Sequence, residues 1–206
     1  MIKNIVFDLG GVVITLDQPQ AVRRFEELGL KNAAELLDPY RQQGIFGDLE
    51  GGQIDAETFR VELSRMVGRE VTYRECCYAW QGYAKCLPER NLEALVRLRQ
   101  EGYRLILLSN TNPYMMEWVG SDRFDGHGHP ISHYFDALYL SYEMQVMKPA
   151  DEIFVRMLMS EQVSPHECLF IDDGPRNVAA ASQRGMRTYC PENGADWTHD
   201  IYQYLK

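Results

Sequence analysis

Residues 3–8 form a short apolar run that ends in Asp8 and leads into the glycine pair Gly10 and Gly11. A run of this length, bounded by turn-forming residues, is typical of a buried strand that ends in a tight turn. Similar runs occur at 104–108, 135–140, 167–171 and 186–190. Helical periodicity lies between them, at 88–101, 150–162 and 175–184. Strands that alternate with helices predict an α/β fold, in which a doubly wound parallel sheet carries helices on both faces.

The alternation of strands and helices is interrupted between residues 17 and 86. Helical patterns appear there at 19–29, 32–43, 55–67 and 72–86, without a strong strand between them. A loop in the middle is predicted by the glycines Gly44, Gly47, Gly51 and Gly52. We therefore expect a helical cap domain at 17–86, inserted after the first strand of a core domain made of 1–16 and 87–206. Residues 119–134 are polar and rich in glycine and histidine, which predicts a surface loop.

The balance of charges limits the expected partners. Hydrophobic residues make up 45% and charged residues 25% of the 206, which is ordinary for a globular protein. The net charge of -9 argues against nucleic acid, because phosphate backbones attract clustered Lys and Arg. The apolar run before Asp8 is too short for a signal peptide or a membrane span. We expect a cytoplasmic monomer or homodimer with no membrane partner, whose five cysteines are free thiols.

Polar side chains stand where the predicted strands end or the next helix begins. These residues are Asp8, Ser109, Asn110, Lys148, Asp172 and Asp173. Because open parallel sheets bind ligands at the carboxyl ends of their strands, we expect these side chains to form one site. Taken alone, the acidic pair after 167–171 could instead cap a helix, since aspartate is a common N-cap.

The chemistry of this set suits phosphoryl transfer. A carboxylate that attacks phosphorus forms an acyl phosphate and divides hydrolysis into two easier steps. Repulsion between a carboxylate and a phosphoryl group calls for a divalent cation, and Mg²⁺ takes few carboxylates together with water and substrate oxygens. An ammonium and a hydroxyl can hold the phosphoryl oxygens while charge develops in the transition state.

The order FDLGGVV, LLSN, KP and IDDGPRN resembles the four motifs of the haloacid dehalogenase superfamily, over residues 4–190. The resemblance implies a Mg²⁺-dependent phosphatase for a small phosphorylated metabolite, such as a sugar phosphate, with Asp8 as the nucleophile that forms an aspartyl-phosphate. It also implies a helical cap that selects substrates. The segment YLSYEMQVMKP and Gly10 are most similar to the branch that contains sugar-phosphate phosphatases and the amino-terminal phosphatase domain of soluble epoxide hydrolases.

The same resemblance implies roles for the other motif residues. Ser109, Asn110 and Lys148 would bind the phosphate, and Ser109 and Lys148 would also assist catalysis. Asn110 would act through its backbone N–H and would orient the loop of the nucleophile. The implied metal ligands are Asp8, the backbone carbonyl of Gly10 and Asp173. Asp172 would support them, and the alternative is that the two aspartates share or exchange these roles.

Gly10 departs from the superfamily pattern. Most phosphatases of the superfamily carry an aspartate there as general acid and base, and such catalysis is worth ~10²–10⁴ in rate. Glycine keeps the backbone carbonyl but supplies no proton. This predicts slow turnover, a substrate with a good leaving group, or an acid from elsewhere. Asp17 is one candidate for that acid, and the alternative is that Asp17 only caps a helix.

Two other functions are compatible with Gly10. A 2-haloacid dehalogenase would use Asp8 to attack carbon without a metal, but Asp172 and Asp173 would then repel Asp8. A regulator that binds a phosphorylated ligand without turnover is the second alternative. The loop at 119–134 contains His127, His129 and His133. Histidines at this spacing could bind a metal, but in a glycine-rich loop they are usually part of a polar surface. Residues in the helical insert that could face a substrate are Phe46, Glu50, Trp80 and Tyr83.

Overall fold

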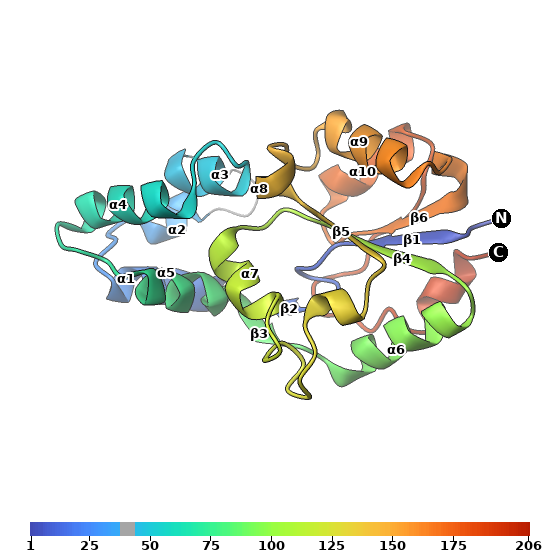
Figure 1. The fold of residues 1–206 in the computed structure, drawn as a ribbon, viewed down its shortest axis with the longest axis horizontal. Coiled ribbons are helices and arrows are strands. Elements are labelled where there is room, and N and C mark those ends of the chain that lie inside the picture. Colours follow the sequence, from blue (N-terminus) through green and yellow to red (C-terminus); the bar gives the residue numbers. More distant parts are fainter. Residues whose placement is uncertain (38–43) are drawn as a thin grey trace.

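A computed structural model describes residues 1–37 and 44–206. Over these residues the main sheet has five parallel strands in the order β5-β4-β1-β6-β7 (Figure 1). The strands are β1 (Asn4–Phe7), β4 (Arg104–Ser109), β5 (Ala137–Leu140), β6 (Cys168–Ile171) and β7 (Arg187–Tyr189). The predicted α/β fold with a parallel sheet is confirmed.

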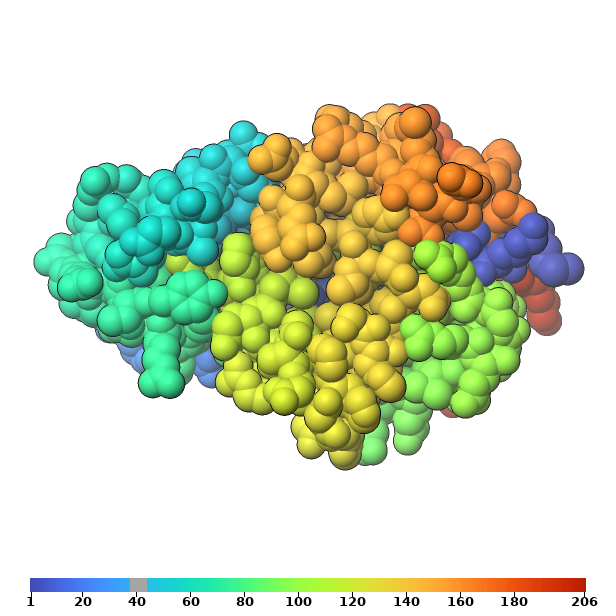
Figure 2. All heavy atoms as spheres, viewed as in Figure 1, coloured from blue at the N-terminus to red at the C-terminus, as the bar shows by residue number. Residues whose placement is uncertain are grey.

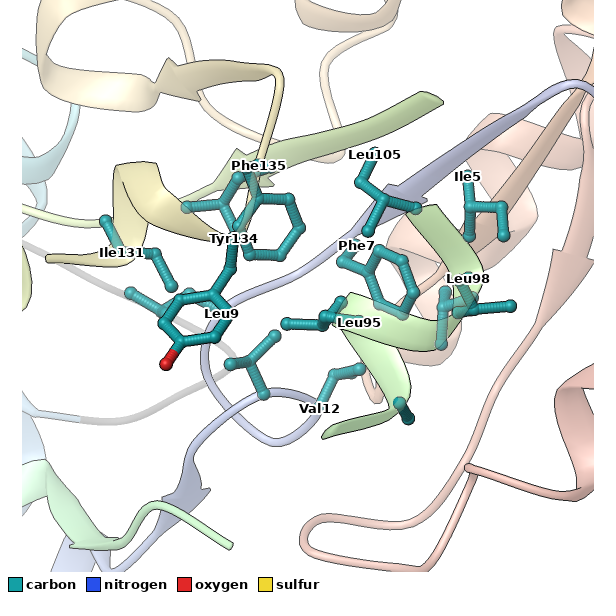
Figure 3. Close-up of a cluster of buried hydrophobic side chains, with 14 of the residues drawn as sticks. Ile5, Phe7, Leu9, Val12, Leu95, Leu98, Leu105, Ile131, Tyr134 and Phe135 are labelled. Atoms are coloured by element: carbon teal, nitrogen blue, oxygen red, sulfur yellow. The ribbon is translucent and has the colours of Figure 1, made fainter. Parts of the chain in front are cut away.

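The central strand β1 is buried over its whole length, and after Asn4 it is apolar, as expected for a strand that is covered on both faces of the sheet. Ile5 and Phe7 belong to one buried cluster, and Val6 belongs to another on the opposite face. Figure 3 shows Phe7 beside Leu95 and Leu98 of α6 (Glu89–Gln100). Full burial of a side chain like that of Phe7 stabilises a fold by roughly 1.5–3 kcal/mol. This packing fixes β1, and therefore fixes the position of the residue that follows it, Asp8.

Helices cover the two faces of the sheet (Figure 1). Leu92, Leu95 and Leu98 place α6 on the face of Phe7. The other face is covered by α9 (Asp151–Glu161) and α10 (Pro175–Gln183), and Ile153 and Phe154 of α9 pack with Val6. The predicted helices at 88–101, 150–162 and 175–184 correspond to these three elements.

A separate group of helices lies beyond the carboxyl ends of the strands, at the left of Figure 1. It contains α1 (Gln18–Glu27), α2 (Ala33–Leu36), α3 (Gly44–Glu50), α4 (Ala56–Val67) and α5 (Tyr73–Trp80), and we call it the helical unit. It has its own buried cluster, in which the ring centroids of Phe25 and Phe46, and of Phe46 and Phe59, are 5.2 Å apart. The short antiparallel pair β2 (Thr15–Leu16) and β3 (Ala84–Cys86) lies where the unit leaves and rejoins the sheet domain.

Local signals define two helices of this unit. Asp55 caps α4 by accepting a hydrogen bond from the backbone N–H of Thr58 at 2.7 Å, and Gly68 ends the same helix in the left-handed conformation. Thr72 and Glu75 form a capping box at the start of α5. These caps explain why the predicted helices at 55–67 and 72–86 begin where they do.

The prediction of a loop around Gly44 and Gly47 is wrong, because both residues belong to α3. Glycine in a helix costs about 1 kcal/mol relative to alanine. Phe46 and Leu49, which are fully buried in the helical unit, offset this cost by tertiary packing.

Other boundaries also differ from the sequence patterns. The helix predicted at 32–43 is observed as α2 over Ala33–Leu36, and residues 38–43 lie outside the described part of the chain. The helix predicted at 72–86 ends at Trp80 and is followed by a 3₁₀ turn at Gln81–Tyr83 and then β3. Two short helices follow strands, namely α7 (Pro113–Val119) after β4 and α8 (Ser141–Met144) after β5.

The helical unit contacts the sheet domain where α3 meets α8 (Figure 2, cyan against gold). The hydroxyl of Ser141 donates to the backbone carbonyl of Glu50 at 2.6 Å. Gly52 has a φ of 65°, and a β-carbon there would stand 2.2 Å from the carbonyl oxygen of Tyr142. Only glycine allows this approach, so Gly52 lets the helical unit pack closely against the sheet domain.

None of the helices described is both long enough and apolar enough to cross a membrane. The five cysteines, all within the described residues, are free thiols, as the sequence predicts.

Candidate active site

The carboxyl edge of the sheet brings together the polar residues that the sequence places after separate strands. Asp8 follows β1, Ser109 ends β4, and Asp172 and Asp173 follow β6. Since parallel strands end at one edge of the sheet, these side chains converge at the edge that faces the helical unit. A pocket of about 470 Å³ opens there, between the sheet edge and the helical unit. Of the predicted site residues, it is lined by Asp8, Gly10, Ser109, Asn110, Lys148 and Asp173.

Lys148 connects two of the carboxylates. Its Nζ lies 2.9 Å from Oδ1 of Asp8 and 2.7 Å from Oδ2 of Asp172, and its side chain is wholly buried. Burial disfavours the charged ammonium, but the attraction of Asp172 and Asp8 outweighs this and raises the pKa of Lys148 above its ordinary value. The lysine is therefore a fixed cation beside Asp8.

Asp172 is the buried anchor of this arrangement. Its carboxylate accepts hydrogen bonds from the backbone N–H of Gly174 at 2.7 Å and from the amide of Asn177 at 3.0 and 3.1 Å. Together with Lys148, these donors occupy both carboxylate oxygens, and the side chain is fully buried. Asp172 thus holds Lys148 and the turn before α10 in place.

Asp173 faces the pocket instead and rests against the turn after β1. A β-carbon at Gly11 would stand 2.0 Å from Oδ2 of Asp173, and the φ of Gly11 is 78°. The glycine is required at this position both by its backbone conformation and by the approach of the carboxylate.

Carboxylate oxygens of Asp8, Asp172 and Asp173 lie within 4.8 Å of one another, and no other group of this kind occurs in residues 1–37 and 44–206. Three carboxylates and one ammonium leave two negative charges, which a divalent cation would balance. Burial, with the repulsion of Asp172 and Asp173, raises the pKa of Asp8 well above its usual range despite the attraction of Lys148. Burial and Asp172 raise the pKa of Asp173 to about 6. Oxygen donors and an excess of negative charge fit Mg²⁺.

Ser109 and Asn110 line the pocket at the end of β4. Ser109 is buried, and its hydroxyl donates to the backbone carbonyl of Asn110 at 3.3 Å. The amide of Asn110 donates to the carbonyl of Lys148 and accepts from the N–H of Lys148, both at 2.9 Å. The side chain of Asn110 therefore fixes the backbone of Lys148, and the role of its backbone N–H toward the phosphate and the loop of Asp8 stays a prediction. This pairing could not be seen in the sequence, because it joins residues 38 positions apart.

Three of the four candidates in the helical insert reach the pocket. Glu50, Trp80 and Tyr83 line it, together with the apolar side chains of Leu16 and Met147. Phe46 is among the fully buried residues of the helical unit, where it packs on other aromatic rings. Of the residues that follow the second motif, Met115 lines the pocket and Tyr114 is buried.

Position 10 has an apolar neighbour. A β-carbon at Gly10 would stand 3.0 Å from Cδ1 of Leu16. Asp17 caps α1, since its side chain accepts a hydrogen bond from the backbone N–H of Gln20 at 3.0 Å. Asp17 is not among the described residues that line the pocket. The structure thus favours the capping role of Asp17 over the catalytic one.

The histidines of the polar loop surround a carboxylate. Asp125 accepts hydrogen bonds from the backbone N–H groups of His127 and His129, and from the hydroxyl of Tyr134 at 2.7 Å. Nδ1 of His129 lies 2.8 Å from the same carboxylate, and the rings of His129 and His133 stack. In the part of the chain described, these histidines belong to no group that could hold a metal. Their observed role is to organise the loop.

The sequence patterns missed several residues of the pocket. Thr111, Asn112 and Arg176 also line it. Asn112 caps α7 by accepting from the N–H of Met115, and its amide donates to Oε1 of Glu50 at 3.4 Å. An asparagine before a proline is a recognisable helix cap, but its contact with the helical unit depends on the tertiary fold.

Comparison with known proteins gives consistent results. Residues 2–185 match a family model described as haloacid dehalogenase-like hydrolase. A D-ribitol-5-phosphate phosphatase from Bacteroides thetaiotaomicron is 45% identical over 201 residues, which cover 98% of this chain and 97% of that protein.

Two solved structures are also similar. One is a predicted HAD-like family hydrolase from Porphyromonas gingivalis, with a TM-score of 0.95 and 44% identity, covering 100% of this chain and 98% of that one. The other is a HAD family enzyme from Bacteroides thetaiotaomicron in complex with magnesium and inorganic phosphate, with a TM-score of 0.89 and 36% identity. That alignment covers 98% of this chain and 100% of the other.

Proposed function

Because the chain belongs to the haloacid dehalogenase-like hydrolases, we propose that it is a Mg²⁺-dependent phosphatase of a phosphorylated sugar alcohol such as D-ribitol 5-phosphate. The observation that carries this proposal is the meeting of Asp8, Lys148 and Asp173 at the base of one pocket. The name of the relative from Bacteroides supports the substrate class, and the magnesium and phosphate complex of the solved relative supports the cofactor.

In this proposal Asp8 is the nucleophile. Its carboxylate attacks phosphorus, the bond from phosphorus to the substrate oxygen breaks, and an aspartyl-phosphate forms. Water then attacks that phosphorus, phosphate leaves, and Asp8 is regenerated. The ammonium of Lys148 lies 2.9 Å from Asp8 and steadies negative charge on the phosphoryl oxygens, while the hydroxyl of Ser109 binds one of them.

Mg²⁺ would be held by Asp8, Asp173 and the backbone carbonyl of Gly10. When bound, the ion would neutralise the carboxylates and the phosphoryl oxygens that approach them. Asp172 has both oxygens engaged by protein donors, so we assign it the supporting role of fixing Lys148. We further propose that residues 17–86 act as a cap domain over a core of 1–16 and 87–206, and that Glu50, Trp80 and Tyr83 face the substrate from it.

The two alternative functions find less support. A dehalogenase that works without a metal would leave Asp8 beside Asp172 and Asp173 with only Lys148 to balance them. A non-catalytic regulator would have no need of a nucleophile that is held beside a buried lysine and faces a pocket.

The direct test measures phosphate release from D-ribitol 5-phosphate, other sugar phosphates and aryl phosphates, with and without Mg²⁺. We expect release that requires Mg²⁺ and that Asp8→Asn abolishes. Exposed Asp151→Asn is the matched control and should keep wild-type activity, since Asp151 begins α9, pairs with Arg184 at the end of α10 and does not line the pocket. Chloride release from 2-chloropropionate, without Mg²⁺-dependent phosphate release from any ester, would overturn the proposal in favour of a dehalogenase.

A further inference from the structure

Leu16 takes up the space in which a side chain at position 10 would lie. Cδ1 and Cδ2 of Leu16 are 3.0 and 3.3 Å from the place of a β-carbon on Gly10. The pocket wall there is apolar, and Ile14 lines it as well. A proton for the leaving group must therefore come from another wall of the pocket.

The position of the leaving group limits where that donor can stand. In phosphoryl transfer the attacking and leaving oxygens lie roughly in line through phosphorus. Asp8 attacks from the sheet edge, so the leaving oxygen points away from β1, toward the helical unit that covers this edge (Figure 1). The residue that protonates the leaving oxygen must therefore belong to the helical unit or to the part of the pocket wall next to it.

Few described pocket residues can donate a proton from that side. The ionisable residues that line the pocket are Asp8, Glu50, Tyr83, Lys148, Asp173 and Arg176. Asp8, Lys148 and Asp173 belong to the sheet edge, and a guanidinium such as that of Arg176 does not give up its proton in proteins. The hydroxyl of Tyr83 donates to the backbone carbonyl of Leu37. Glu50 is the carboxyl group that the helical unit brings to the pocket.

Glu50 is held firmly in that place. It is the last residue of α3, only 5% of it is exposed, and its backbone carbonyl accepts from the buried hydroxyl of Ser141 at 2.6 Å. Its Oε1 accepts from the amide of Asn112 at 3.4 Å, which ties the carboxyl group to the loop that follows Ser109. A preorganised carboxyl group of this kind suits proton transfer.

We infer that Glu50 is the general acid and base of the reaction and has the role that an aspartate at position 10 would otherwise have; this inference rests on the proposed phosphatase function. As Asp8 bonds to phosphorus, the leaving oxygen takes the proton of Glu50 and departs as an alcohol, which leaves Glu50 a carboxylate. In the second step the Glu50 carboxylate takes a proton from water as the water oxygen bonds to phosphorus. The bond from Asp8 to phosphorus breaks, phosphate is released, and Glu50 is protonated again.

The test compares leaving groups in Glu50→Gln, with Glu26→Gln, an exposed glutamate of the helical unit, as the matched control. The substrates are D-ribitol 5-phosphate, 1-propyl phosphate and p-nitrophenyl phosphate. Both alkyl esters need an acid, and nitrophenolate leaves without one. We expect kcat/KM of Glu50→Gln to fall by ~10² or more on both alkyl esters and to stay within about threefold on the aryl ester. The aryl ester should also give a burst of about one nitrophenol per site, because water lacks its base in the second step.

Each other result has a definite meaning. An equal loss of kcat/KM on all three esters, or a loss confined to D-ribitol 5-phosphate, would overturn the acid role. The first result would make Glu50 structural, and the second would make it a ligand of the substrate hydroxyls. A wild-type enzyme with no Mg²⁺-dependent activity on any ester would overturn the proposed function itself. The conservative variant Glu50→Asp should recover part of the alkyl ester activity if Glu50 transfers protons.

Discussion

The α-carbon of Gly11 lies against the carboxylate of Asp173, so closely that a β-carbon at position 11 would stand 2.0 Å from Oδ2 of Asp173. We predict that Gly11→Ala moves Asp173 and weakens Mg²⁺ binding by about 10–100-fold, the range seen when support of a metal ligand is lost. The left-handed backbone adds roughly 1–2 kcal/mol of strain. Isothermal titration with Mg²⁺ and denaturant unfolding measure the two effects separately.

Gly68 supplies a matched control for this substitution. Its φ is 75°, close to the 78° of Gly11, but a β-carbon there meets nothing within 4 Å. Gly68→Ala should therefore lose similar stability and keep its affinity for Mg²⁺. Equal Mg²⁺ affinity in the Gly11→Ala and Gly68→Ala variants would show that the contact with Asp173 does not position a metal ligand.

Removal of the Lys148 ammonium should destabilise the protein as well as inactivate it. Lys148→Met leaves Asp172 buried with the donors of Gly174 and Asn177 but without a cation. Loss of one partner of a buried ion pair costs about 3–5 kcal/mol of folding free energy. Denaturant unfolding of Lys148→Met should show a loss of this size, and exposed Lys85→Met should unfold like wild type.

The double variant Lys148→Met/Asp172→Asn separates stability from catalysis. It should regain part of the lost folding free energy, because the uncompensated buried charge is gone, but it should stay inactive. A double variant that is no more stable than Lys148→Met would contradict the role of Asp172 as the buried anion that needs this lysine.

The sequence predicts the sheet and the motif residues well because local patterns determine both. Apolar runs such as 104–108, short and placed between helical patterns, are typical of buried parallel strands, and the polar residues at their ends then meet at one edge of the sheet. Asp8, Ser109, Lys148 and Asp173 accordingly line one pocket. The family resemblance is confirmed by the match over residues 2–185.

Features that depend on tertiary packing were not predictable. Glycines at 44 and 47 indicate a loop, and only the burial of Phe46 and Leu49 makes the segment helical. The reciprocal hydrogen bonds of Asn110 with Lys148 join distant segments. No periodicity indicates that Leu16 fills the space beside Gly10.

The contact of Leu16 with position 10 leads to a third prediction. In the single variant Gly10→Asp, the new side chain meets Leu16. This variant should therefore hydrolyse alkyl phosphates no faster than wild type. In a Glu50→Gln background, Gly10→Asp combined with Leu16→Ala opens room for the new acid. We expect this triple variant to exceed Glu50→Gln/Leu16→Ala by at least about tenfold in kcat/KM on 1-propyl phosphate. No gain over that double variant would contradict the view that position 10 lacks only an acid and the space for it.

The pKa of Asp173, raised to about 6, predicts how Mg²⁺ stabilises the protein at different pH. In the metal-free protein the ionised carboxylate is disfavoured relative to the unfolded chain, so stability falls as pH rises through about 6. Mg²⁺ binds the ionised form and stabilises the fold according to its concentration relative to Kd. The rise in Tm caused by Mg²⁺ should therefore be larger at about pH 7.5 than at about pH 5. An equal rise at both pH values would contradict this linkage, and Asp173→Asn should reduce the difference, with the rest coming from Asp8, whose pKa is also raised.

The central claim is that Asp8 is phosphorylated during turnover, and the stereochemical course at phosphorus tests it most directly. The substrate is a phosphorothioate analogue of D-ribitol 5-phosphate, made chiral at phosphorus with a heavy oxygen isotope and hydrolysed in isotopically labelled water. Two successive in-line displacements, one by Asp8 and one by water, predict retention of configuration in the thiophosphate product. Inversion would mean that water attacks the substrate directly, and it would contradict the account.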